Sequence, residues 1–381
     1  MTPDGAPMKV LCVFGTRPEA IKMAPVVRAL QEHESIDCRV CVTAQHREML
    51  DDVLELFEIV PDYDLDVMRD NQSPSQVVAV VLSELETILR AEKPRWMLVQ
   101  GDTVTTMAAA MAAFFERIPV GHIEAGLRTW DRWNPFPEEM ARSTTRIVAD
   151  LHFASTPLAE RNLLKEGVSP EDIVVTGNTV IDALMDVTEL RPDRAGWEHA
   201  DLVDPRKRLI LVTAHRRESF GEPLLGICRA IHELAATYRN DIQFVFPVHP
   251  NPQVQEPVRR LLSGIANVSL VKPLDYLSLA RLMHSAFLIL TDSGGIQEEA
   301  PSLKVPVLVL REVTERSEAV EIGAAKLVGT DTDFIIKHVS RLLDDPAEHA
   351  AMVPGSNPYG DGQASGRIVE MLIDRTFGAT R

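Results

Sequence analysis

Short apolar runs typical of buried parallel strands alternate with amphipathic, helix-like stretches along nearly the whole chain. The helix-like stretches include Glu19–Gln31, Ser75–Ala91 and Thr103–Arg117. The strand-like runs of the first half are Lys9–Phe14, Asp37–Thr43, Trp96–Gln100, Val120–Ile123, Leu151–Ala154 and Ile173–Thr176. In such an alternation each helix joins two parallel strands by a right-handed crossover. The pattern therefore predicts a doubly wound α/β fold.

A polar interval from about Glu189 to Arg208 interrupts the alternation and is predicted to be a linker. Strand-like runs resume after it, at Leu209–Val212, Gln243–Phe246, Val268–Val271, Phe287–Leu290 and Val307–Leu310. A length of 381 residues suits two domains of ~150 residues or more. We expect two Rossmann-like domains, residues 1–190 and 206–362, with a cleft between them. A C-terminal helix at 363–381 is expected to pack back on the first domain.

The charge balance is strongly acidic, with 56 acidic and 39 basic residues and a formal net charge of −17. This argues against general binding to nucleic acid or to an anionic membrane surface. No apolar run approaches the ~20 residues of a membrane-spanning helix, and the N-terminus lacks a secretory pattern. Four cysteines are too few for a disulfide scaffold, so a cytoplasmic protein is expected. No metal-ligand spacing occurs in the sequence, and no metal or cofactor is predicted.

Polar residues that could do chemistry follow the strands of the first half. Ligands of open parallel sheets bind beyond the carboxyl ends of the strands. Arg17 and Lys22 follow the first strand at a helix N-terminus, a natural anion site, although a surface Arg and Lys is the simpler interpretation. Asp102 and Glu124 follow two consecutive strands and should emerge side by side, and Glu138 is predicted at a helix start. Asp102 could instead cap the next helix, and Glu138 alone could be an ordinary first-turn glutamate.

Arg142 lies four residues beyond Glu138, near enough to pair with it. Carboxylates that converge opposite a diphosphate site are what acid/base chemistry on a nucleotide-activated sugar requires.

The second half contains a turn suited to phosphate. Ser293, Gly294 and Gly295 lie between a strand and the predicted helix Ile296–Leu303, where backbone N–H groups and the helix dipole favour an anion. Glu299, one turn into that helix, could accept two hydrogen bonds from a ribose diol. A capped helix N-terminus with no ligand is the simpler interpretation.

Two histidines follow separate strands of the second half. These residues, His215 and His249, suggest a cationic rim because Arg216 and Arg217 adjoin the first of them.

Several sequence blocks together resemble the non-hydrolysing UDP-N-acetylglucosamine 2-epimerases, in the family order and over roughly Val10 to Gly329. The blocks are Phe14–Lys22, Gln100–Thr103, His122–Arg128, Pro135–Glu139, Gly177–Thr179, His215–Glu218, Ser293–Glu299 and Thr314–Arg316. The resemblance implies a GT-B arrangement of two Rossmann-like domains. It also implies reversible conversion of UDP-GlcNAc to UDP-ManNAc through elimination of UDP, and it suggests a homodimer.

The resemblance assigns roles by position. Asp102, Glu124 and Glu138 match catalytic carboxylates, and His215 matches a histidine at the diphosphate. The residues expected to bind the UDP-sugar are Arg17, Lys22, Arg142, His249, Asn251, Tyr276, Ser293, Gly294, Gly295, Glu299 and Arg316. Some family members bind a second UDP-GlcNAc as an activator, near the segment that matches Gln45, His46 and Arg47, with Gln72 nearby.

The chain departs from the family pattern at three places. Ser219 and Ala141 each replace a usual Asn, and Trp130–Trp133 is an unusual stretch. The last two border the sugar side, so a diacetamido or uronic-acid UDP-sugar could be the substrate instead. The sequence also leaves open a GT-B glycosyltransferase, a UDP-sugar-binding protein without activity and a hydrolysing epimerase.

Overall fold

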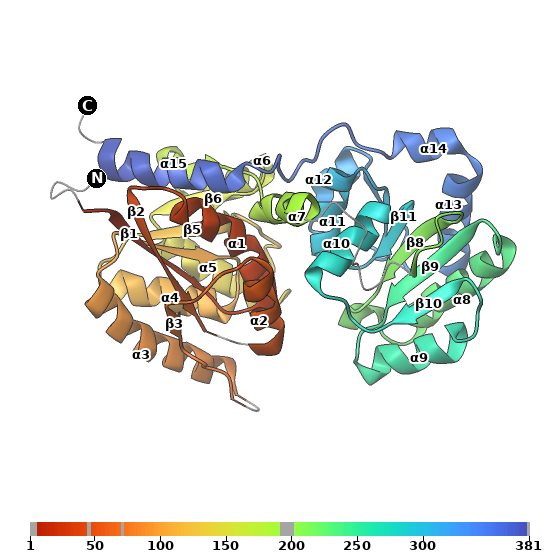
Figure 1. Cartoon of the computed structure of the whole chain (residues 1–381), viewed down its shortest axis with the longest axis horizontal. Helices are drawn as coiled ribbons and strands as arrows, with labels where there is room; N and C mark the ends of the chain where they lie inside the picture. The colour runs from red at the N-terminus through yellow and green to blue at the C-terminus, as the bar shows by residue number, and fades with distance from the viewer. Residues whose placement is uncertain (1–5, 44–46, 70–71, 191–201, 379–381) are drawn as a thin grey trace. The chain divides into compact units, whose positions relative to one another are not determined.

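The computed structural model describes residues 6–43, 47–69, 72–190 and 202–378. The chain divides into two compact units (Figure 1). The N-terminal unit comprises Met1–Asp186 together with Tyr359–Arg381, and the C-terminal unit comprises Val187–Pro358. No helix within these described ranges is long and apolar enough to cross a membrane.

The N-terminal unit contains a seven-stranded parallel sheet in the order β3-β2-β1-β4-β5-β6-β7. Its strands are β1 (Met8–Phe14), β2 (Ile36–Val42), β3 (Tyr63–Asp64), β4 (Trp96–Gln100), β5 (Val120–Ala125), β6 (Leu151–Ala154) and β7 (Ile173–Val175). The strand order reverses between β1 and β4, which pair in parallel with Val13 opposite Val99. The turns after these two strands therefore lie at the topological switch point, where open α/β sheets bind ligands.

Helices cover the sheet of this unit in two layers: α2, α1 and α15 pack together, and so do α3, α4 and α5 (Figure 1). The helices are α1 (Arg17–Gln31), α2 (Arg47–Leu56), α3 (Pro74–Glu92), α4 (Val104–Phe115), α5 (Glu138–Val148), α6 (Pro157–Lys165), α7 (Thr179–Leu190) and α15 (Ala364–Phe377), with the 3₁₀ turn η1 (Pro170–Asp172). Helices α1 and α3 begin with capping boxes, Thr16 with Glu19 and Ser73 with Gln76. Each box satisfies backbone N–H groups that have no partner inside the helix.

The C-terminal unit contains a six-stranded parallel sheet in the order β10-β9-β8-β11-β12-β13. Its strands are β8 (Arg208–Thr213), β9 (Ile242–Pro247), β10 (Val268–Val271), β11 (Leu288–Thr291), β12 (Val307–Val309) and β13 (Ala325–Leu327). The order reverses between β8 and β11, with Thr213 opposite Thr291 at the strand ends. The turns after β8 and β11 therefore form the second switch point.

The helices of the C-terminal unit enclose a core rich in aliphatic side chains from β8, β9 and α8. They are α8 (Glu222–Thr237), α9 (Pro252–Leu262), α10 (Tyr276–Ser285), α11 (Gly294–Glu299), α12 (Ser317–Glu321), α13 (Thr332–Asp344) and α14 (Pro346–Ala351), with the 3₁₀ turns η3 (Arg217–Ser219) and η4 (Ala300–Leu303).

The predicted fold class is confirmed: two α/β units, each with a parallel sheet. All predicted strand segments form strands, most within one residue of the predicted bounds. Strands β3 and β13 were not predicted because they contain two and three residues and have no apolar run. The single helix predicted over Ile296–Leu303 is wrong in its bounds. The helix starts at Gly294 and becomes 3₁₀ from Ala300, where Pro301 lacks the N–H that an α-helix needs.

Candidate active site

The carboxylate of Glu19 joins the ends of the two central strands of the N-terminal unit. Its Oε2 accepts hydrogen bonds from the backbone N–H groups of Gly15 and Thr16, both at 2.8 Å. Its Oε1 accepts hydrogen bonds from the hydroxyls of Thr103 and Thr106, at 2.6 and 3.0 Å. The side chain is buried, so these four donors replace water around the charge. One group thus holds together the turns that follow β1 and β4.

Glu124 lies at the end of β5 between a cation and an amide. Lys22, from α1, forms an ion pair with Glu124 Oε2, and Gln100 Nε2 donates a hydrogen bond to the same oxygen at 2.7 Å. The backbone of Glu124 has a φ of +62°, in the left-handed region that non-glycine residues rarely adopt. Such strained residues cluster at active sites and ligand clamps. Arg17, predicted beside Lys22, is the first residue of α1 in the turn that Glu19 organises.

Asp102 follows β4 and pairs with Arg142 of α5. Arg142 Nη2 donates to Asp102 Oδ2 at 2.5 Å, and Arg142 Nη1 lies 3.3 Å from Oε2 of Glu139. The predicted pairing of Arg142 with Glu138 is wrong. Positions three and four residues back both lie on the same face of a helix, and the one three back is the buried carboxylate that meets the guanidinium. Strands β4 and β5 pair directly, as expected. Asp102 lies two residues beyond β4, but Glu124 belongs to β5, which extends to Ala125 rather than ending at Ile123 as predicted.

Glu138 begins α5, as predicted for a helix start. Within the described part of the chain, its Oε2 atom is buried without a hydrogen-bond partner. A buried acceptor of this kind is uncommon in folded proteins and is often functional. It leaves Glu138 able to accept a proton or a hydrogen bond from a ligand.

His122 of β5 contacts the backbone of the turn that carries Asp102. Its Nε2 lies 2.7 Å from the carbonyl oxygen of Gly101. Burial lowers the pKa of His122 to about 4, although the Gly101 carbonyl opposes the shift. The ring is therefore neutral at pH 7, with Nε2–H as the donor to Gly101.

Asp292 organises the corresponding site of the C-terminal unit. It is fully buried just after β11 and accepts hydrogen bonds from the backbone N–H groups of His215 (2.9 Å) and Arg216 (2.9 Å). It also accepts a hydrogen bond from the hydroxyl of Ser219 at 3.1 Å. Ser219, one of the departures from the family pattern, thus supports the His215 turn. Beside the turn, the hydroxyls of Thr213 and Thr291 lie 2.6 Å apart.

The predicted phosphate turn carries an arginine. Ser293 is the N-cap of α11, and Gly294 and Gly295 are its first two residues. A Cβ on Gly294 would lie 3.1 Å from Cζ of Arg316, so the guanidinium rests against this glycine. Arg316 Nε donates to the buried Glu298 at 2.9 Å, and its Nη1 lies 3.3 Å from Glu315.

Three arginines set the charge state of Glu315. Burial alone would raise the pKa of Glu315, but Arg316, Arg311 and Arg216 lower it to about 2. Glu315 is therefore ionised at neutral pH and pairs with guanidinium groups on both sides of the turn.

The remaining residues predicted to contact the nucleotide also lie in this unit. The Tyr276 hydroxyl donates to Glu299 Oε2 at 3.1 Å, with both side chains buried. The rings of His249 and His215 have centroids 6.1 Å apart. Asn251 caps α9, and its backbone N–H donates to His249 Nδ1 at 3.2 Å.

The predicted activator segment is only partly covered. Gln45 and His46 lie outside the described residues, and Arg47 begins α2. Gln72 Oε1 accepts a hydrogen bond from the backbone N–H of Arg69 at 3.1 Å.

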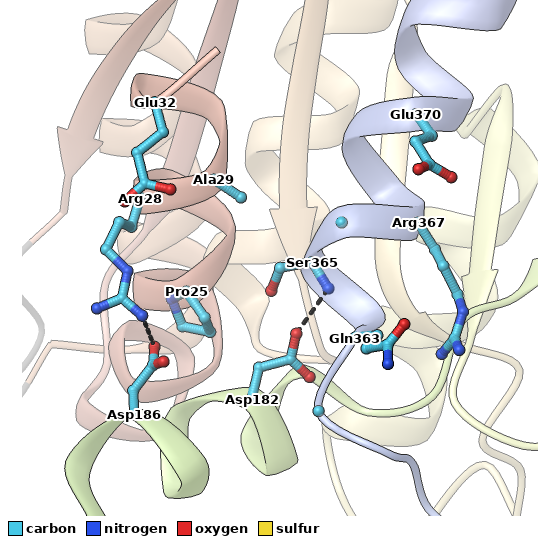
Figure 2. Close-up of a pocket in the computed structure, with 12 residues that line it drawn as sticks. Pro25, Arg28, Ala29, Glu32, Asp182, Asp186, Gln363, Ser365, Arg367 and Glu370 are labelled. Atoms are coloured by element: carbon cyan, nitrogen blue, oxygen red, sulfur yellow. Dashed lines mark hydrogen bonds and ion pairs between the residues drawn. The ribbon is translucent and has the colours of Figure 1, made fainter. Parts of the chain in front are cut away.

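A separate polar pocket of about 440 Å³ lies in the N-terminal unit, lined by α1, α7 and the start of α15 (Figure 2). Asp182 accepts hydrogen bonds there from the backbone N–H groups of Ala364 and Ser365, and Asp186 pairs with Arg28. None of the predicted site residues lines this pocket. The hydrogen bonds of Asp182 hold the start of helix α15 in place, and the pocket is separate from the candidate site.

Sequence reasoning missed the residues that organise these turns: Glu19, Gln100, Glu139, Asp292 and Glu298. The sequence contains a signal for one of them, Glu19, because Thr16-Arg-Pro-Glu19 has the spacing of a capping box.

Comparison with known proteins identifies the family. The sequence profile of UDP-N-acetylglucosamine 2-epimerase matches residues 28–373. The chain is 54% identical over 370 residues to UDP-N-acetylglucosamine 2-epimerase of Escherichia coli K12, covering 96% of this chain and 98% of that protein. A crystal structure of the Neisseria meningitidis UDP-GlcNAc 2-epimerase bound to UDP-GlcNAc is 50% identical, with a TM-score of 0.90 over 96% of this chain and 100% of that one. An S. aureus MnaA–UDP co-structure is 45% identical, with a TM-score of 0.87 over 97% and 96% of the two chains.

The likeness extends over almost the full length of these relatives, and the chain therefore belongs to the UDP-N-acetylglucosamine 2-epimerase family.

Proposed function

We propose that this protein interconverts UDP-GlcNAc and UDP-ManNAc by inverting C2 of the sugar. The observation that carries the proposal is the set of acids in the N-terminal unit: Asp102 paired with Arg142, Glu124 paired with Lys22, and Glu138 with an unpartnered buried oxygen. Inversion at carbon needs a group that removes a proton and a group that returns one to the opposite face. A carboxylate can take up a proton in the first role and, once protonated, give one back in the second.

The C-terminal unit would hold the nucleotide. We assign the phosphates to the turn of Ser293, Gly294 and Gly295 with Arg316 beside it, and to His215. Glu299, which Tyr276 orients, would accept hydrogen bonds from the ribose diol. His249 and Asn251 would contact the rest of the nucleotide.

The N-terminal unit would supply Arg17 to the diphosphate and Lys22 and Arg142 to the sugar. The nucleotide and the sugar belong to one substrate molecule. Remote contacts with the nucleotide can then hold the sugar in place during a slow chemical step.

The chemistry follows from the acidity of C2. No carbonyl adjoins this carbon, so its hydrogen is not acidic in the ground state. Cleavage of the C1–O bond, with both electrons leaving on UDP, gives C1 oxocarbenium character and acidifies the hydrogen at C2. A carboxylate takes that proton, and the C–H electrons form the C1=C2 bond of a 2-acetamidoglucal. Return of a proton to the other face of C2, and of UDP to C1, yields the epimer.

The enzyme must retain UDP while it is detached from the sugar and must exclude water, since water at C1 would release the free sugar. Cationic groups at the leaving diphosphate stabilise the charge that develops there. Arg17, Arg316 and His215 would serve this purpose.

Incubation with UDP-GlcNAc in deuterated water, without an acceptor, tests the proposal. Deuterium should appear at C2, and UDP-ManNAc should form, as followed by NMR and mass spectrometry. Unexchanged substrate would overturn the proposal. The same experiment with diacetamido and uronic-acid UDP-sugars identifies the preferred sugar, because the Trp130–Trp133 stretch and Ala141 border the proposed sugar side.

Rival activities give different products in this assay. A GT-B glycosyltransferase would leave C2 unexchanged, and a binding protein without activity would retain substrate with no turnover. A hydrolysing epimerase would accumulate UDP and free sugar. The intact set of Asp102, Glu124 and Glu138 favours the epimerase, because neither transfer to an acceptor nor simple binding needs three such acids.

We also propose that the protein is a homodimer. Phe114 and Phe115 at the end of α4 and Ile147 near the end of α5 are more than half exposed. Phe114 and Phe115 line one hollow together with Val148, the neighbour of Ile147 in α5, so these side chains contribute to one apolar surface of the kind that marks protein interfaces. Light scattering should give twice the chain mass of 42.3 kDa. Phe115→Asp should shift the protein towards monomer.

A further inference from the structure

Asp292 contacts His215 through both its backbone and its side chain. The backbone N–H of His215 donates to Asp292 Oδ2 at 2.9 Å, and His215 Nδ1 lies 3.3 Å from Asp292 Oδ1. The Asp292 side chain has no exposure to solvent. An ionised carboxylate accepts hydrogen bonds and donates none, so a carboxylate facing Nδ1 favours the tautomer that carries its proton on that nitrogen.

The His215 side chain is 42% exposed, while its Nδ1 edge faces the buried Asp292. Nε2 is therefore the atom that a ligand can reach. A phosphate oxygen is also an acceptor, and it requires a proton on Nε2. Asp292 on the Nδ1 side and a diphosphate at Nε2 together favour a ring that carries protons on both nitrogens.

Without a ligand the surroundings of His215 favour the neutral ring. Partial burial lowers the pKa of His215, and the charges of Arg216 and His249 act in the same direction. Asp292 is the group that opposes them. Arg216 is itself drawn towards Glu315, 3.6 Å away.

We propose that Asp292 is a positioning residue that holds Nδ1 of His215 against its carboxylate and leaves Nε2 for the diphosphate, so that nucleoside diphosphate binding is accompanied by protonation of His215. The unliganded ring carries its one proton on Nδ1. When the diphosphate binds, Nε2 takes one proton from solvent, and the new N–H donates to a phosphate oxygen. This inference deepens the proposed function and rests on it, because it places a diphosphate beside His215.

Calorimetry with UDP at pH 8 measures the proton directly. Binding enthalpies are compared in buffers of different ionisation enthalpy, and the slope gives the number of protons taken up per UDP bound. UDP has no titrating phosphate at this pH, so we expect uptake of about one proton by the wild-type protein. Uptake should be abolished in His215→Gln and reduced at least twofold in Asp292→Asn. Zero uptake by the wild type, or unchanged uptake in His215→Gln, would overturn the proposal.

Two control variants show whether a loss of proton uptake comes from losing the position of His215 or from general damage to the site. Ser219→Ala removes one hydrogen bond to Asp292 but keeps the carboxylate, and it should retain wild-type proton uptake. His249→Gln removes the neighbouring imidazole and should weaken UDP binding, since His249 is assigned to the nucleotide, but it should retain the proton uptake per UDP bound, since the proton is assigned to His215. Loss of uptake in His249→Gln would place the proton on His249 and refute the assignment.

Nitrogen NMR of ¹⁵N-histidine-labelled wild-type protein gives a test that needs no stable Asp292 variant. The His215 signal is identified by its loss in His215→Gln. Without UDP we expect the Nδ1–H tautomer, and with UDP the imidazolium. An Nε2–H tautomer in the free protein would refute the positioning by Asp292 even if the enzyme epimerises UDP-GlcNAc. The Nδ1–H tautomer in a protein that neither binds UDP nor exchanges C2 would instead refute the proposed function alone.

Discussion

Arg142 Nη2 lies 2.5 Å from Asp102 Oδ2, and the guanidinium is almost entirely buried. Helix α5 and the turn after β4 are thereby joined by a charge-assisted hydrogen bond. The same arginine approaches Glu139, whose carboxylate accepts hydrogen bonds from the backbone N–H groups of Thr129 and Trp130. The carboxylate of Asp102 is therefore tied, through one cation, to the loop that precedes Glu138.

Asp102→Asn should abolish deuterium exchange at C2 while leaving UDP affinity within about twofold of wild type. The amide keeps the size of the side chain but cannot accept a proton. Exchange is followed by NMR and UDP binding by calorimetry. Asp172→Asn is the matched control, because Asp172 pairs with Arg375 on the exposed surface of the same unit, and it should behave as wild type. Near-normal exchange in Asp102→Asn would remove Asp102 from the catalytic groups.

Glu19→Gln should lower the free energy of unfolding by about 2–4 kcal/mol. The buried side chain accepts four hydrogen bonds, two on each carboxylate oxygen, and in the variant the charge is lost and the amide nitrogen that replaces one oxygen cannot accept any of them. It should also reduce kcat, since the turns of Arg17 and Asp102 lose their shared anchor. Urea unfolding and C2 exchange measure the two effects. Gln76→Ala, which breaks the exposed capping box of α3, should cost no more than about 1 kcal/mol. Equal stability of the two variants would contradict the role given to Glu19.

Much of the fold was predictable because strands buried on both faces appear as continuous apolar runs, and β4, β6 and β10 match the predicted bounds. The positions of Asp102 and Glu124 were also predictable, since consecutive strands that pair put their end residues at one edge. The partners of these acids were not. Arg142 meets Asp102 across 40 residues of sequence, and Lys22 meets Glu124 across 102. Only the packing of α1 and α5 on the sheet decides those pairs.

The function of Asp292, in the C-terminal unit, could not be predicted from the sequence either. In sequence it is one polar residue between a strand and a serine, with nothing to distinguish it from a helix cap. Its function as the acceptor for the His215 turn depends on the pairing of β8 with β11, which are separated by two other strands in the chain. The strand order of the sheet, rather than any local pattern, brings the two turns together.

Gly294→Ala should weaken UDP binding by about tenfold or more with little loss of stability. The new Cβ would lie 3.1 Å from Cζ of Arg316, so the guanidinium would have to shift by a few tenths of an ångström and would lose its alignment with the phosphate turn. Calorimetry with UDP and thermal unfolding test both parts. Gly366→Ala is the matched control, because that glycine lies in helix α15 with no atom within 4 Å of the added Cβ. Unchanged UDP affinity in Gly294→Ala would show that Arg316 does not need this contact.

The protein should lose stability as the pH falls from 6.5 towards 4, in part because of two buried histidines on neighbouring strands. Burial lowers the pKa of His122 to about 4 and that of His152 to about 3, while both should titrate near 6.5 in the unfolded chain. Between these values the unfolded state binds protons that the folded state excludes, so acid favours unfolding. Above pH 7 both states are neutral, and the histidines contribute no pH dependence.

His152→Leu removes one of these groups and should flatten the profile. Relative to wild type, the loss of unfolding free energy between pH 7.5 and pH 5 should be smaller by about 1–2 kcal/mol. Urea titrations at several pH values measure it, and the comparison cancels the contribution of the carboxylates shared by both proteins. Parallel profiles for wild type and His152→Leu would mean that His152 is protonated equally in the folded and unfolded states.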